Sequence, residues 1–185
     1  MTVVISMLRG VNVAGHHQIR MAAVRRLYQS LKLVDAQTCL QSGNVVFTTD
    51  ERDLAAVAKR IQQGMEREFG FLPEVILRTS PELRAAVGRN PFAARRGLDP
   101  SKLLVGFTVS VPAAAAQERL LGFATATEEV RLDGREVYVY FHNGVGQAKL
   151  SWAAIEKTLN TPATARNWNT VSKLLVLAER METAR

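Results

Sequence analysis

Short runs of β-branched and other apolar residues alternate along the first half of the chain with apolar residues at helical spacing. The predicted elements are a strand at 3–8, a helix at 21–31, strands at 38–41 and 45–47, a helix at 54–65 and a strand at 74–79. The segment 42–44 has the glycine and asparagine that tight hairpin turns require. The order β-α-β-β-α-β is typical of ferredoxin-like folds, in which two helices cover one face of an antiparallel sheet.

The second half shows the same order of elements without the last strand. A serine and a proline begin a helix at 80–88, and a basic loop follows it. The later elements are a strand at 102–109, a helix at 112–121, a hairpin over 130–141 around Asp133-Gly134, a helix at 150–159 and an amphipathic C-terminal helix. The predicted fold class is therefore α+β, with tandem ferredoxin-like units (βαββαβ then βαββα), antiparallel sheets with helices on one face, and a C-terminal helix. Because no residue-level repeat joins the halves, this interpretation rests on element order alone.

This order divides the chain into three parts. Residues 1–79 are the first ferredoxin-like unit, 80–101 a helix and a basic linker loop, and 102–185 the second unit with the C-terminal helix. A length of 185 residues allows one or two domains. The pattern does not decide whether the two halves share one core.

The composition is that of an ordinary folded protein, with 47% hydrophobic and 22% charged residues. No apolar run approaches the length of a membrane span, and the first residues lack the basic and apolar regions of a signal peptide. Cys39 is the only cysteine, so no internal disulfide can form, and the reducing cytoplasm is the expected compartment. The net charge of +7 marks a basic protein and favours anionic partners, either small molecules or nucleic acid.

Polar side chains gather where the predicted topology brings two segments to one end of the first sheet. The strands at 3–8 and 38–41 run the same way, so the loop after the first and the hairpin after the second leave the sheet together. These two segments contain Arg9, Asn12, Gln41, Ser42 and Asn44. Arginine offers a planar fork for carboxylate or phosphate, and amide and hydroxyl groups complete a polar site. These residues are the first candidate for an anion-binding site.

A structural interpretation of the same residues stays open. Asn12, Ser42 and Asn44 are residue types that hydrogen-bond nearby backbone and hold turns, with Gly10, Gly15 and Gly43 supplying the torsion angles. The loop after the first strand is neither a Walker loop nor GxGxxG, because no Lys-Ser pair or third glycine follows. Nucleotide binding would therefore need another route.

A second candidate segment precedes the C-terminal helix. Its residues are Arg166, Asn167, Trp168 and Asn169, and Asn167 or Asn169 is the expected N-cap. Because exposed N–H groups at a helix start bind anions, this segment could add to the site. Trp168 is either a packing anchor or a stacking platform, and the packing role is the commoner one.

Other candidate chemistry is weak. The adjacent histidines His16 and His17 have no cysteine or carboxylate nearby in the sequence, so no metal site is predicted. No Ser-His-Asp set, paired carboxylates or nucleophile elbow can be assembled with His142, so no catalytic residue is nominated and no cofactor is expected. We expect Cys39 to be inaccessible and unreactive, because 38–41 is predicted to be a strand.

Three segments together resemble a bacterial family known as domain of unknown function 1697. They are LRGVNV at 8–13, QSGNVVF at 41–47 and ARNWNT at 165–170. The resemblance spans nearly the whole chain and implies a duplicated ferredoxin-like architecture, with no established activity to carry over. Ala14 stands where the family pattern tends to have glycine, and Cys39 where it tends to have an aromatic residue, which weakens any thiol chemistry.

The leading functional hypothesis is a binding module for a phosphate- or carboxylate-bearing ligand, with nucleotides and nucleic acid among the candidates. It would use the Arg9 loop, the hairpin at 41–44 and the segment 166–169. Two alternatives stay open: a small-molecule enzyme that uses the same polar cluster, and a structural or partner-binding protein whose motifs only hold turns. An enzyme would need a titratable group beside Arg9, and the sequence places none there. The pattern does not decide the oligomeric state.

Overall fold

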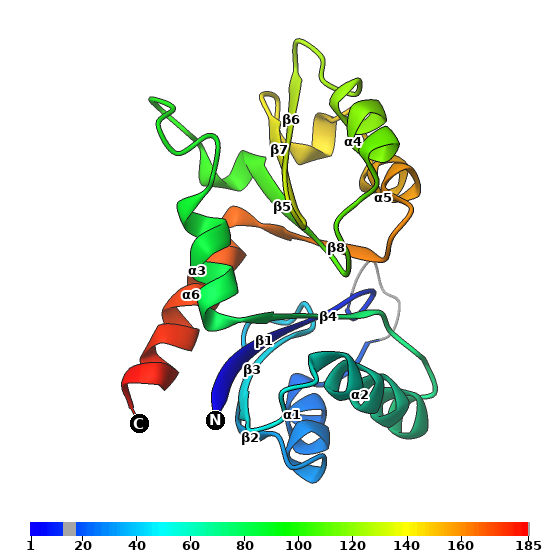
Figure 1. Cartoon of the computed structure of the whole chain (residues 1–185), viewed down its shortest axis with the longest axis vertical. Helices are drawn as coiled ribbons and strands as arrows, with labels where there is room; N and C mark the ends of the chain where they lie inside the picture. Colours follow the sequence, from blue (N-terminus) through cyan, green and yellow to red (C-terminus); the bar gives the residue numbers. More distant parts are fainter. Residues whose placement is uncertain (13–17, 185) are drawn as a thin grey trace. The chain divides into compact units, whose positions relative to one another are not determined.

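The computed structural model describes residues 1–12 and 18–184 (Figure 1). Over these residues the chain forms two four-stranded antiparallel sheets and six α-helices, the last at the C-terminus, which confirms the predicted α+β class. The chain divides into two compact units, Met1–Arg84 with Lys173–Arg185 and Ala85–Ser172. None of the described helices combines the length and the apolar character that a membrane crossing needs.

The sheet of the first unit has the strand order β2-β3-β1-β4. Its strands are β1 (Thr2–Leu8), β2 (Val34–Thr38), β3 (Asn44–Thr49) and β4 (Val75–Thr79). Because β1 and β2 are each antiparallel to β3, they run the same way and end at the same end of the sheet. The loop after β1 and the turn after β2 therefore leave the sheet side by side.

The edge strand β2 is displaced from its predicted position. The sequence predicts a strand at 38–41, but β2 begins at Val34 and ends at Thr38, so this prediction is wrong. Only Ala36 is buried in β2, and this strand lacks the apolar run that marks the other strands of the sheet. Its pairing with β3 also shifts register between Val34 and Gln37, as in a β-bulge.

Helices α1 (Met21–Ser30) and α2 (Leu54–Phe69) cover one face of this sheet (Figure 1). Their apolar stripes and the inward residues of the strands form one buried core. In this core the ring of Tyr28 lies edge-on to Phe47, with centroids 5.6 Å apart. The Tyr28 hydroxyl shares a hydrogen bond of 2.7 Å with Ser6 Oγ, so the one polar group of that side chain is satisfied.

The sheet of the second unit has the strand order β6-β7-β5-β8, which matches that of the first. Its elements are β5 (Leu103–Thr108), α4 (Ala114–Leu121), β6 (Glu128–Asp133), β7 (Glu136–Phe141), α5 (Trp152–Leu159) and β8 (Ala163–Asn167). The sequence predicts no last strand here, and β8, which pairs antiparallel with β5, shows that this prediction is wrong. β8 contains two alanines and a single β-branched residue, so its composition does not mark it as a strand.

Helices α3 (Ser80–Gly88) and α6 (Trp168–Thr183) each begin directly after the last strand of a sheet. Arg78 of β4 and Arg166 of β8 occupy the same register relative to the first strand of their sheets, two residues before the helix starts. Both arginines are buried. The two sheets thus carry a buried arginine at the same place before the helix that follows their last strand.

Candidate functional site

The side chain of Asn12 joins the loop after β1 to two other segments. Its Nδ2 donates hydrogen bonds to the carbonyl oxygens of Gln41, at 2.7 Å, and Ile19, at 3.0 Å. Its Oδ1 accepts a hydrogen bond of 2.7 Å from the Ile19 N–H. The φ of Asn12 is 54°, in the left-handed region that asparagine adopts more readily than most residues. The amide of Asn12 therefore holds backbone segments together.

The turn between β2 and β3 packs against the same loop. The Leu8 N–H donates a hydrogen bond of 2.8 Å to the Gly43 carbonyl, and Gly43 has a φ of 69°. A Cβ atom at Gly43 would lie 2.9 Å from the Cβ of Val11, so this position requires glycine. Asn44 is buried, and its Nδ2 donates a hydrogen bond of 2.9 Å to Ser42 Oγ.

The structure therefore brings the first group of candidate residues to one end of the first sheet. Asn12, Ser42 and Asn44 bond within the cluster, which favours the turn-holding interpretation for these three. Arg9 is exposed at the end of β1, and its backbone N–H donates to the Glu74 carbonyl at 2.9 Å. Gln41 is exposed and borders a pocket.

This pocket, of about 390 Å³, lies at the start of α1. Its lining residues are Asn12, Gln18, Ile19, Arg20 and Gln41. Arg20 is the N-cap residue of α1; among the described residues no side chain caps this helix end, and its first turn has no acidic residue. The positive end of the helix dipole thus lies at the pocket with no carboxylate in the first turn of the helix. Arg20 belongs to no motif, and its place just before a predicted helix is the only sequence signal for it.

The second candidate segment lies in the second unit, at the end of β8 and the start of α6. Arg166 is buried in β8, where it donates a hydrogen bond of 2.8 Å to Thr164 Oγ1, and burial lowers its pKa to about 10. Asn167 accepts a hydrogen bond of 3.0 Å from the Asn169 N–H, as an N-cap residue does. Trp168 is half-buried as the first residue of α6. These contacts hold the start of α6.

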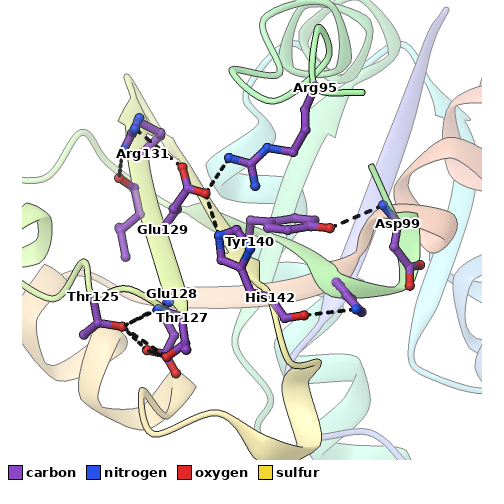
Figure 2. Close-up of polar contacts among 11 residues, drawn as sticks. Arg95, Asp99, Thr125, Thr127, Glu128, Glu129, Arg131, Tyr140 and His142 are labelled. Carbon is purple, nitrogen blue, oxygen red and sulfur yellow. Dashed lines mark hydrogen bonds and ion pairs between the residues drawn. The ribbon is translucent and has the colours of Figure 1, made fainter. Parts of the chain in front are cut away.

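A charged cluster that the sequence interpretation missed lies on the second sheet (Figure 2). Glu129 of β6 accepts hydrogen bonds from Arg95 and from His142 Nε2, the latter at 2.8 Å. The guanidinium of Arg131 lies 3.7 Å from the other carboxylate oxygen. The Arg95 guanidinium also lies over the ring of Tyr140, 4.7 Å from its centroid. The basic loop, β6 and β7 each contribute to this cluster, so no local motif marks it.

Hydrogen bonds favour the charged forms of two neighbouring carboxylates in this region. The bond from Arg95 is the main cause of the lowered pKa of Glu129. Glu128 accepts hydrogen bonds from the hydroxyls of Thr125 and Thr127, and these bonds lower its pKa. The cluster therefore anchors the basic loop to β6 by charge, and it contains no serine or cysteine that would serve as a nucleophile.

Metal ligation finds no support in the part of the chain that the structure describes. Those residues contain no group of three or more histidine, cysteine or acidic side chains placed to hold a metal ion. Gly15, His16 and His17 lie outside the described residues.

Cys39 lies just beyond β2 and is only partly buried, so the expected inaccessible strand position is wrong. Burial raises the pKa of its thiol, and the charge of Lys173 only partly opposes this effect. A raised pKa leaves less thiolate at neutral pH, so we expect Ellman's reagent to modify native Cys39 more slowly than the denatured chain at pH 7. The rate should rise as the pH is increased. Equal rates for the native and denatured chains at pH 7 would contradict this.

Comparison with known proteins adds a family and a fold. Residues 1–138 match the family described as Protein of unknown function (DUF1697). The chain belongs to this family. This confirms the resemblance to that family; the motifs at 8–13 and 41–47 lie within the matched residues, whereas the motif at 165–170 lies outside them. No curated protein matches the chain.

A solved structure has a similar fold. It is that of a conserved bacterial protein from Streptococcus pneumoniae, with a TM-score of 0.73 and 19% sequence identity. The similarity covers 97% of this chain and 99% of that chain. At this identity the likeness shows the fold alone.

Proposed function

We propose that this chain is a tandem ferredoxin-like, cytoplasmic binding protein that takes an anionic small molecule in the pocket at the start of α1. The ligand class is a phosphate- or carboxylate-bearing compound, nucleotides included. The observation that carries the proposal is the position of Arg20 at an uncapped helix N-terminus, within a pocket of about 390 Å³. A protein site that combines helix N–H groups with a guanidinium is suited to bind anions.

The other lining residues support this ligand class. Gln18 and Gln41 are exposed amides that can donate to anionic oxygens, while Asn12 fixes the backbone of the rim. The net charge of +7 attracts anions toward the whole molecule. Arg20 supplies the positive charge that binds the anion, because Arg9 is not among the residues that line the pocket.

Replacing Arg20 by glutamine should weaken anion binding. Loss of one charge-assisted contact costs roughly 1.5–3 kcal/mol, which corresponds to about 10- to 100-fold in dissociation constant. The measurement is a thermal-shift titration of the full chain with inorganic phosphate, pyrophosphate and citrate. A ligand at a concentration 100 times its dissociation constant stabilises the folded protein by about 2.7 kcal/mol.

The control is Arg26→Gln, which removes an exposed arginine of α1 that does not line the pocket. It lowers the net charge by the same amount, so any general charge effect is common to both variants. If the two variants lose the same small amount of affinity, or if no anion gives a saturable shift, the proposed site is wrong. A short oligonucleotide that binds with a steep salt dependence and ignores Arg20→Gln would instead support a nucleic-acid surface elsewhere.

A further inference from the structure

A second pocket of the first unit lies between α1, the edge strand β2 and the end of α6. It has a volume of about 470 Å³, and its polar lining is supplied by Arg25, Gln29, Asp35 and Gln37. Met181 of α6 adds an apolar side chain. This pocket shares no lining residue with the pocket at the start of α1.

The local structure explains why these side chains share one hollow. Arg25 and Gln29 are four residues apart on α1, so they lie on the same face of the helix one turn apart. Asp35 and Gln37 flank the buried Ala36 in the edge strand β2, where the register shift between Val34 and Gln37 interrupts the regular alternation of side chains. Helix α1 contacts β2 directly, and residues of both elements line the hollow.

The backbone at Asp35 is unusual. Its φ is 53°, in the left-handed region, and the pairing of β2 with β3 shifts register between Val34 and Gln37. Bulges re-aim side chains, and both bulges and left-handed residues are over-represented at functional sites. An acidic side chain is thus held at the pocket by a backbone conformation that a regular edge strand would not have.

The charges of this pocket are of opposite sign and accessible. Arg25 and Asp35 are both exposed, and among the described side chains no ion pair joins the two. A cation, an anion, two amides and an apolar side chain around one hollow match a small molecule that carries both a carboxylate and an ammonium group. We infer that this pocket binds a zwitterion of the α-amino acid type, with its carboxylate on Arg25, its ammonium on Asp35 and its side chain against Met181.

Binding at this pocket does not depend on the pocket at the start of α1 and can be tested separately. The full chain is titrated by calorimetry with L-leucine and L-methionine, and with N-acetyl-L-leucine and L-leucinamide, each of which lacks one of the two charges. The free amino acids should bind saturably, and each blocked compound at least about tenfold more weakly, the scale of one lost charged contact. Absence of saturable binding by either free amino acid, or equal binding of the blocked compounds, would overturn the inference.

Variants of Arg25 and Asp35 test which residue binds each charged group of the amino acid. Arg25→Gln should weaken leucine binding at least about tenfold, and Asp35→Asn should do the same while keeping a residue that tolerates a positive φ. Arg26→Gln is the matched control and should bind leucine as the unaltered chain does. Unchanged binding in both pocket variants would refute the site, and loss of leucine binding in Arg20→Gln would refute it by placing leucine in the other pocket. Should Asp35→Asn fail to fold, as judged by circular dichroism, Arg25→Gln decides alone.

Discussion

Replacing Asn12 by alanine should destabilise the protein by roughly 2–4 kcal/mol and abolish anion binding at the start of α1. Alanine loses the two hydrogen bonds to the Gln41 and Ile19 carbonyls and the one from the Ile19 N–H. It must also adopt a φ of 54°, which costs about 1 kcal/mol without a compensating side chain. The free energy of unfolding is measured by urea denaturation and followed by circular dichroism.

Two further variants separate the causes. Asn12→Gly removes the side chain but adopts a positive φ freely, so it should recover about 1 kcal/mol relative to alanine. Asn12→Asp keeps the shape but faces two carbonyl oxygens with a group that only accepts hydrogen bonds, so it should destabilise about as much as alanine. If Asn12→Ala unfolds within about 0.5 kcal/mol of the unaltered chain, the hydrogen bonds of Asn12 do not hold the loop.

Replacing Gly106 by alanine should destabilise the second unit by roughly 2–4 kcal/mol. Gly106 lies in the middle of β5, and a Cβ atom there would come 2.2 Å from Cη2 of Trp152, the first residue of α5. At a strand position with free space, replacing glycine by alanine would raise the free energy of unfolding by up to about 1 kcal/mol. At Gly106 we expect the free energy of unfolding to fall instead. Urea denaturation gives the free energy of unfolding.

A double-mutant cycle tests this close approach. In the background of Trp152→Leu, which leaves room over the strand, Gly106→Ala should cost less than about 1 kcal/mol. Equal costs of Gly106→Ala in the two backgrounds would show that Trp152 is not the reason glycine is needed.

The arrangement at the end of the first sheet is readable from the sequence, because it follows from element order and turn chemistry. Once strands one and two run the same way, the loop of Asn12 and the turn at Gly43 must emerge together. The strand β8 is not readable in this way. Its residues, Ala163–Asn167, lack a β-branched or aromatic run, and it becomes a strand because it pairs with β5.

Two arginines of different candidate sites, Arg20 and Arg95, are also not marked by the sequence, for different reasons. Arg20 has no motif around it, and its role depends on the pocket that the folded loop and α1 create. Arg95 lies 34 positions before Glu129, and only the packing of the basic loop onto β6 brings them into contact. Rules based on residue spacing identify side chains that lie together on one helix or strand. These sites combine side chains from several elements, so such rules do not identify them.

The most direct test of the central claim is a titration of the isotope-labelled full chain with pyrophosphate, followed by proton–nitrogen NMR at physiological salt. The account predicts saturable shifts that are largest at the backbone N–H groups of Met21 and Ala22 and at the side-chain amide of Gln41, and that disappear in Arg20→Gln. These N–H groups belong to the first turn of α1, beside the pocket. Shifts spread evenly over the surface arginines and lysines, or no saturable shift at all, would contradict it.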